Sequence, residues 1–421
     1  MTAVPSGVRG SSSLDAWLHE HGEGLVAIRR QLHANPELSG QEHATTETVA
    51  ARLELAGLAP RRLAVGTGLI CEVDGVGTPR LDGAADDGGV TARDPAPQGP
   101  VLALRADLDA LAMDDEKVVH YRSQTPGVAH ACGHDVHTTV VLGTALYLAH
   151  HREELAGRVR FLFQPAEERV PGGALDVIAD GGITGVDAVM GLHCEPKMDV
   201  GTVGLTAGPV SSAADMARIS LTGPGGHTAR PEMTVDLIRV AARVVAQLPA
   251  RVGELLGAPE LVKVVFGAVH AGDAANVIPG HCELRASVRT PSLETWERLP
   301  EVVDRAVRDV VGDSGAEHRL DYTHGVPPVV NDGAVIDLIE RAAIRALGRA
   351  AIVPATQSWG GDDFAWYTRQ VPGAYVRLGV HDPAAGPPLD LHAGHFDVDE
   401  RAIELGVRLL VAAVEEYFAS T

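Results

Sequence analysis

The sequence predicts an α/β fold in which a largely parallel central sheet, flanked by helices, carries an inserted α+β domain. Strand-like and helix-like segments alternate up to about residue 209 and again after about residue 326, an order that builds parallel sheets. Between these stretches the order is β-α-β-β-α-β, which is typical of a ferredoxin-like unit. At 421 residues, the chain is also longer than one hydrophobic core usually fills.

The first stretch begins with two helices. Leu25, Ile28 and Leu32 recur at helical spacing, and Gly57 ends a second helix over 45–55. We then expect strands over 69–73, 101–105, 159–163 and 188–192, and helices over 135–151 and 173–179. The Gly-, Asp-, Ala- and Pro-rich segment 77–100 is interpreted as a surface loop, with an ordered insertion as the alternative.

The remaining segments define the domain boundaries. In the middle third we expect strands over 217–221, 262–269, 282–288 and 318–322, with helices over 235–248 and 293–311. The alternation of strands and helices seen in the first stretch then resumes, with a helix over 336–347, a strand over 374–378 and a final helix over 400–417. Residues 1–209 and 326–421 are therefore predicted to form one domain, and residues 210–325 a satellite domain.

Composition excludes several classes of function. A formal charge of −21, with scattered basic residues, argues against a nucleic-acid partner. No apolar run reaches the length of a membrane span, and no signal-peptide core follows Met1. Four widely spaced cysteines cannot build a disulfide framework in a chain this long, so we expect a cytoplasmic protein.

The densest group of chemically active residues is His-Ala-Cys-Gly-His-Asp-Val-His at 130–137. Cys132 and His134 are two residues apart, and Gly133 between them permits backbone angles that aim both side chains at one point. The following helix would favour a thiolate through its N-terminal N–H groups. Thiolate with imidazole suits zinc, cobalt, nickel or manganese rather than magnesium or calcium.

Further candidates follow predicted strands. Glu167 and Glu168 lie where the strand over 159–163 gives way to a loop, and His193 ends the strand over 188–192. Ligands of open α/β sheets collect at the carboxyl ends of strands, so one of the two carboxylates could bind metal while the other moves protons. Cys194 is left out, because successive side chains of an extended chain point in opposite directions.

A last histidine comes from the C-terminal part. His392 and His395 both lie in Asp-Leu-His-Ala-Gly-His-Phe at 390–396, and their spacing alone does not choose between them.

Together the motifs resemble a known family of amidohydrolases, the hippurate hydrolases and plant auxin-conjugate (indole-acetyl-amino-acid) hydrolases, within a clan that includes aminoacylases and glutamate carboxypeptidases. The resemblance rests on motifs in family order: Leu-His-Ala-Asn-Pro-Glu-Leu-Ser at 32–39, Leu-Arg-Ala-Asp-Leu-Asp-Ala-Leu at 104–111, His-Ala-Cys-Gly-His-Asp at 130–135, Gln-Pro-Ala-Glu-Glu at 164–168, Gly-Gly-His at 225–227, Asn-Val-Ile-Pro at 276–279 and Asp-Phe at 363–364.

The resemblance implies an α/β domain with two divalent ions and a satellite domain that forms a homodimer. It implies that Cys132, His134, Glu168, His193 and one C-terminal histidine are the metal ligands, with Glu167 as the catalytic acid and base. Phe396 aligns with the phenylalanine of the family's His-Ser-Pro-x-Phe motif, which makes the last ligand His392.

Residues of the satellite domain are also implicated by the resemblance. His227 would stabilise the oxyanion and would do so in the active site of the dimer partner. Asn276 and Arg289 would position the substrate, with Arg285 as the alternative to Arg289, because a guanidinium binds a carboxylate in two-pronged fashion.

The implied reaction is hydrolysis of the amide bond of an N-acyl amino acid. A dipeptidase or carboxypeptidase with the same chemistry is the nearer alternative, and a metal-stabilised binding protein without turnover is the other. The family's Ser-Pro is Ala393-Gly394 here, its Ser-Glu-Asp-Phe is Gly-Asp-Asp-Phe at 361–364, and the 77–100 loop is longer, so the acyl group stays open.

Overall fold

The computed structural model describes residues 12–75 and 99–420. Its chain divides into two compact units. The first comprises residues 1–208, 330–356 and 366–421, and the second comprises residues 209–329 and 357–365. The predicted loop over 77–100 lies almost wholly outside the described residues.

The first unit is built on an eight-stranded sheet of order β1-β2-β4-β3-β5-β16-β6-β15. Neighbours among β4, β3, β5 and β16 are parallel, whereas β2 pairs antiparallel with β1 and β4, and β6 pairs antiparallel with β16. The sheet is therefore mixed, with a parallel centre as predicted. The strands are β1 (Arg61–Arg62), β2 (Leu69–Asp74), β3 (Val101–Asp107), β4 (Arg158–Gln164), β5 (Ala188–Asp199), β6 (Val203–Leu205), β15 (Ile352–Pro354) and β16 (Gly373–His381).

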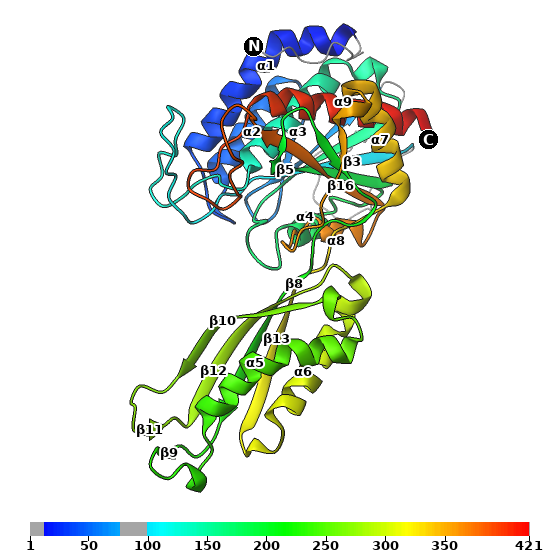
Figure 1. Ribbon diagram of the computed structural model, residues 1–421. Coiled ribbons are helices and arrows are strands. Elements are labelled where there is room, and N and C mark those ends of the chain that lie inside the picture. The colour runs from blue at the N-terminus through cyan, green and yellow to red at the C-terminus, as the bar shows by residue number, and fades with distance from the viewer. Residues whose placement is uncertain (1–11, 76–98, 421) are drawn as a thin grey trace, which may run out of the picture. The chain divides into compact units, whose positions relative to one another are not determined.

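Helices cover both faces of this sheet. In Figure 1, α1, α3 and α9 lie on one face and α4 lies on the other. Every residue of β3 and β4 is buried, as expected for strands covered on both sides. The helices are α1 (Ser12–Ala34), α2 (His43–Leu55), α3 (His134–His150), α4 (Ala174–Ala179), α7 (Gly333–Leu347), α8 (Ala365–Thr368) and α9 (Arg401–Ser420).

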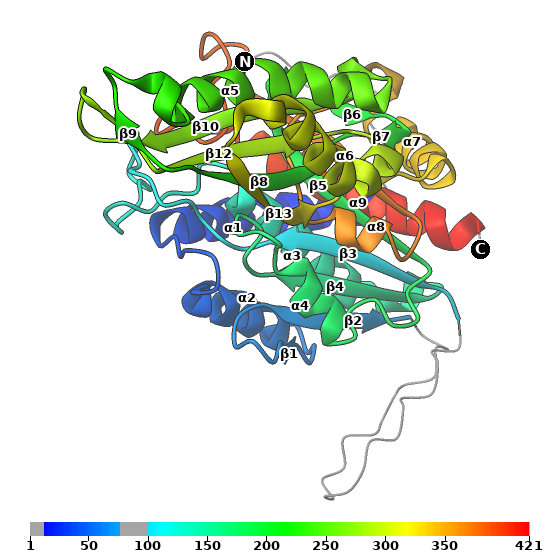
Figure 2. The ribbon, with the colours of Figure 1, turned by 90° about the horizontal axis from the view of Figure 1, so that it is seen from below.

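The second unit has the predicted ferredoxin-like order. Its antiparallel sheet runs β10-β12-β8-β13, and α5 and α6 pack together on it, as Figure 2 shows. Buried and exposed residues alternate along β8, which fits a sheet covered on one face only. The elements are β8 (Ala214–Thr222), β9 (Gly226–His227), α5 (Leu237–Leu256), β10 (Lys263–Ala271), β11 (Val277–Ile278), β12 (His281–Arg289), α6 (Leu293–Val311) and β13 (Glu317–Val326).

Several strands extend beyond their predicted ends, and the extension of β5 bears on the site. β5 continues to Asp199, so His193 lies within the strand and not at its end. The reason is that β16 pairs with β5 as far as Asp199, whereas β3 pairs with β5 only up to Gly191. His193 therefore still lies beyond the last residue of β5 that β3 covers.

A buried ion network fixes the start of α3 against α1. Arg29 Nε donates to Asp135 Oδ2 at 2.7 Å, and its other nitrogens donate to Asp397 and Glu400. His33 Nδ1 also lies 2.7 Å from Asp135 Oδ2. Burial lowers the pKa of Arg29, but these acids raise the pKa by more than burial lowers it. The net pKa is therefore raised, and the guanidinium stays charged.

This network predicts a large loss of stability for Arg29→Met. The substitution leaves the buried Asp135 carboxylate without its main counter-ion, which should cost about 3–5 kcal/mol of unfolding free energy. Arg30→Met is the control: Arg30 pairs with Glu400, but its side chain is 38% exposed, so the loss should stay within about 1 kcal/mol. Chemical denaturation followed by circular dichroism measures both, and equal losses would contradict the role given to Arg29.

Candidate metal centre

Six of the predicted site residues meet in the first unit. Three groups of side chains, each with its donor atoms within 4.8 Å of one another, overlap here: Cys132 with His134 and His193, Cys132 with Glu168 and His392, and His134 with Glu167 and Glu168. The residues come from the loop before α3, the start of α3, the loop after β4, strand β5 and the loop after β16. Cys132 belongs to two groups, so its sulfur lies between two sets of donors.

The hydrogen bonds of the histidines leave the correct nitrogens available for a metal. His193 Nδ1 lies 2.7 Å from the carbonyl oxygen of Cys194 and donates to it, which leaves the Nε2 lone pair 3.5 Å from Cys132 Sγ. His134 Nδ1 likewise donates to the carbonyl oxygen of Asp109 at 2.9 Å. The Nε2 atoms of both rings therefore face the group of donors.

Two orphaned atoms test whether an ion fits. His134 Nε2 and Glu168 Oε1 are both buried and have no hydrogen-bond partner in the described part of the chain, although they lie 3.9 Å apart. Glu168 Oε1 also lies 3.3 Å from His392 Nε2. Ligands about 2.0–2.3 Å from one ion are separated by about 3.3–3.8 Å, close to these spacings, so the residues fit a divalent metal.

The structure distinguishes the two C-terminal histidines. His392 Nε2 approaches Glu168, whereas His395 Nε2 lies 3.0 Å from Glu116 Oε2. His392 also has a positive φ of 57°, a conformation that non-glycine residues rarely adopt. Among the described residues only Ala166 shares this feature, and it precedes Glu167. Both strained positions therefore adjoin side chains of the group.

Gly133 has the unusual backbone that the sequence predicted. Its φ is 89°, and a Cβ there would lie 2.8 Å from Cys194 Sγ. The expected thiolate stabilisation is wrong for the metal-free protein, however. Burial of Cys132 raises the pKa of its thiol, so that in this environment the thiol needs a bound cation to lose its proton.

Other members of the 130–137 cluster have different partners. His137 Nε2 accepts the Cys194 N–H at 2.8 Å, and its Nδ1 donates to Asp107 at 2.7 Å, so it has no lone pair left for a metal. Asp135 binds Arg29 and His33. Burial lowers the pKa of His130 to about 3, which keeps this ring neutral.

Asp109 is the main residue of the site to which the sequence analysis assigned no role. Its carboxylate accepts hydrogen bonds from the backbone N–H groups of Glu167 and Glu168 and from the Ser39 hydroxyl, at 3.1, 2.9 and 2.6 Å. Burial raises its pKa, but the nearby His134 ring and the hydrogen bonds from Ser39 and Glu168 together hold the pKa below its ordinary value. The signal was the Asp-Leu-Asp pattern of 107–109, just after a buried strand.

Three predicted residues lie in the second unit. His227 is exposed on β9, and its Nδ1 accepts the Ala229 N–H at 3.0 Å. Asn276 immediately precedes β11, whose Val277 pairs with His227. Arg289 ends β12, where its Nη1 donates to the carbonyl oxygen of Trp359 and its Nε to Ser287 Oγ. The alternative, Arg285, is exposed and pairs with Glu283.

Buried thiol, imidazole and carboxylate groups beside the carboxyl ends of parallel strands define an α/β protein with a metal-binding active site. The chain belongs to peptidase family M20/M25/M40, whose model matches residues 103–416. This membership confirms the resemblance drawn from the sequence motifs.

Relatives of known sequence support the assignment. A Bacillus subtilis N-acetylcysteine deacetylase is 35% identical over 90% of this chain and 93% of its own length. A Rhodococcus jostii protein that carries the name of a glutamate–cysteine ligase is 41% identical over 92% of this chain, which spans only 46% of that relative.

A solved structure shares the whole fold. A Bacillus subtilis protein described as a dinuclear metal-binding peptidase of the M20 family superposes with a TM-score of 0.80 and 31% identity. The match covers 97% of this chain and 99% of that one.

Among the described residues of our chain, no helix is both long and apolar enough to cross a bilayer.

The contacts of Asp109 predict that Asp109→Asn weakens metal binding. An amide oxygen is a weaker acceptor, and the amide NH₂ would oppose one of the two backbone N–H groups that hold the Glu167–Glu168 loop. We expect divalent-metal affinity to fall about 10–100-fold, as is usual when the support of a ligand is lost. Titration of the metal-free protein with Zn²⁺ or Mn²⁺ measures the change.

Asp114→Asn is the matched control for this experiment. Asp114 is exposed and accepts the Gly127 N–H, so the same chemical change there should leave metal affinity unaltered. Equal affinities of the Asp109 variant and the wild type would remove Asp109 from the support of the site.

Proposed function

We propose that this protein hydrolyses the amide bond of N-acyl amino acids with the help of two divalent ions. The observation that carries the proposal is the pair of buried atoms His134 Nε2 and Glu168 Oε1, which make no hydrogen bond within the described residues and lie beside the carboxylate of Glu167. The family membership and the acyl-amino-acid relative support the reaction class.

Cys132, His134, Glu168, His193 and His392 would hold the ions, and Cys132 belongs to two of the groups of possible ligands. The donor types suit zinc, manganese, cobalt or nickel. When bound, such ions supply Lewis acidity that lowers the pKa of a coordinated water and polarises the amide carbonyl.

Glu167 is our candidate for the general base and acid. Its Oε2 lies 3.9 Å from His134 Nε2, while its backbone N–H is held by Asp109, so the carboxylate projects from a fixed loop. Glu167 would take a proton from the attacking water and deliver it to the amine that leaves. Its side chain is mostly buried, which limits competition from bulk water.

His227 would stabilise the oxyanion. Because its Nδ1 accepts the Ala229 N–H, the neutral ring carries its proton on Nε2, the atom that can donate to a developing negative charge. We further propose that the second unit pairs with that of another chain in a homodimer, so that His227 serves the partner's site. Asn276 and Arg289 would bind the carboxylate end of the substrate.

The alternative substrates are dipeptides and C-terminal amino acids of short peptides. They contain the same amide bond next to a carboxylate, so the identity of the acyl group decides between them. The proposal for N-acyl substrates rests on the deacetylase relative.

A substrate panel tests the reaction. N-acetyl and N-benzoyl amino acids should be hydrolysed faster than dipeptides by protein loaded with Zn²⁺, Mn²⁺ or Co²⁺, as measured by release of the free amino acid. Glu167→Gln is the control variant: it should retain the metal but lose more than 90% of kcat, a change of at least about 1.4 kcal/mol in the barrier. Faster cleavage of dipeptides would favour the alternative, and a Glu167→Gln variant with near-normal kcat would exclude this base.

Subunit exchange tests the role of His227. His227→Ala should lower kcat about 10²–10³-fold without loss of metal, as expected when an oxyanion donor is removed. A mixed dimer of one His227→Ala chain and one Glu167→Gln chain would contain one site with both defects and one with neither, so mixing two inactive variants should restore activity. No recovery after exchange, or a fully active monomer, would rule out donation from a partner.

A further inference from the structure

A second pocket lies at the end of α3 that is remote from the metal centre. It has a volume of about 500 Å³ and is formed by α1, the C-terminal end of α2 and the C-terminal end of α3 with the residues that follow it. Such a volume is sufficient for a small organic molecule. The first residue of α3 is His134 and its last is His150, so the helix length of about 25 Å separates the two sites.

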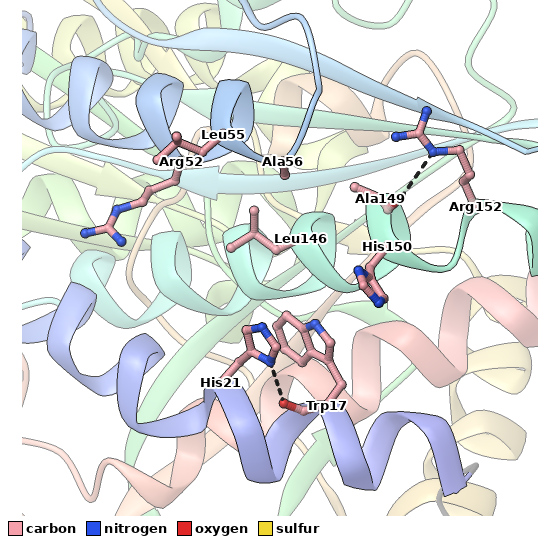
Figure 3. Close-up of a pocket in the computed structure, with 9 residues that line it drawn as sticks. All are labelled: Trp17, His21, Arg52, Leu55, Ala56, Leu146, Ala149, His150 and Arg152. Carbon is pink, nitrogen blue, oxygen red and sulfur yellow. Dashed lines mark hydrogen bonds between the residues drawn. The ribbon is translucent and has the colours of Figure 1, made fainter.

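The floor of this pocket is apolar. Leu146 and Ala149 of α3 contribute to it, together with Leu55 and Ala56 from the end of α2 and the indole of Trp17 from α1. Figure 3 shows the Trp17 ring below Leu146, with Leu55 and Ala56 across from them. Leu55 is 85% exposed, an unusual position for a large aliphatic side chain. An apolar ligand body would bury this surface and gain from its removal from water.

The rim of the pocket is basic. Among the described residues that line it, Arg52, Arg152, His21 and His150 are basic and none is acidic, although the chain has 56 acidic and only 35 basic residues other than histidine. No hydrogen bond or ion pair joins the Arg52 side chain to another described residue. Arg152 uses its Nε for the Ala149 carbonyl oxygen, which leaves its terminal amino groups for a ligand. The local charge is thus opposite to that of the molecule.

The rings on α1 favour an aromatic ligand. Trp17 and His21 are stacked with ring centroids 4.5 Å apart and an angle of 6° between their planes. Trp17 is only 6% exposed, whereas His21 is exposed at the pocket edge. Figure 3 shows the guanidinium groups of Arg52 and Arg152 toward the two ends of the pocket, where either can reach a carboxylate on a bound ring system.

From these features we propose that this pocket is a binding site for a small aromatic carboxylate, separate from the metal centre. The aromatic rings and the aliphatic floor take the apolar body, and the arginines take the charge. The inference depends on the pocket alone and does not depend on the reaction proposed above.

Isothermal titration calorimetry of the metal-loaded protein tests the site with two probes of the same shape. Naphthalene-2-carboxylate should bind, and the neutral naphthalene-2-methanol should bind at least about tenfold more weakly. Equal affinity of the two probes, or no binding of the carboxylate up to its solubility limit, would overturn the proposal.

A matched pair of variants assigns the binding to this pocket. Leu55→Glu places a carboxylate where the ligand would lie, and Leu55→Gln has the same size without the charge. We expect naphthalene-2-carboxylate to bind about tenfold more weakly to Leu55→Glu than to Leu55→Gln, because like charges a few ångströms apart repel. Since Leu55 is exposed, neither change should affect folding, and turnover should stay normal in both.

The arginines provide an independent check. The double variant Arg52→Ala/Arg152→Ala should also bind the carboxylate about tenfold more weakly. Arg61→Ala/Arg349→Ala removes the same charge from exposed residues elsewhere and should bind it normally. If all four variants bind the carboxylate equally, the bound probe lies elsewhere and the proposed site is wrong.

Discussion

The carboxylate of Asp109 is the constraint on which the metal centre depends. It joins segments that are far apart in the chain, because it accepts from Ser39 and from the N–H groups of Glu167 and Glu168 while lying against His134. Without an acceptor at this point, two backbone donors of a partly buried loop would lose their hydrogen bonds, at a cost of up to about 1–3 kcal/mol each. One buried acid thus sets the position of a proposed ligand, of the proposed base and of the loop that carries both.

Behind this layer, a second set of buried charges holds the start of α3. Arg29 and His33 on α1 bind Asp135, the residue after the proposed ligand His134. Asp107 supports strand β5 in a similar way. It accepts a hydrogen bond from His137 Nδ1, and His137 Nε2 accepts the N–H of Cys194, the residue after His193. The proposed ligands are therefore held in place by charged and polar residues that are not themselves proposed as ligands. Such supporting residues are common in metal sites.

Much of this could be predicted from the sequence, because periodicity and strand-end position are local signals. The order of elements predicted both sheets, and the cluster of His and Cys residues at 130–137 identified Cys132 and His134 as candidate ligands. What could not be predicted depends on contacts between distant residues. The antiparallel edges of the large sheet and the continuation of β5 along β16 are decided by partners remote in the chain. Spacing alone did not choose between His392 and His395; the family resemblance chose His392, which contacts the distant Glu168. The burial that raises the pKa of Cys132 has the same origin.

The order of strands in the large sheet has a consequence for synthesis of the chain. β16 lies between β5 and β6, yet it is synthesised only after all the residues of the second unit. Until residues 373–381 emerge, one edge of β5 has no partner, and open strand edges are sites of misassociation between nascent chains. His392 follows β16 in the chain, so the proposed ligand set is completed later still. A chaperone that shields β5 during this interval would raise the yield of active protein.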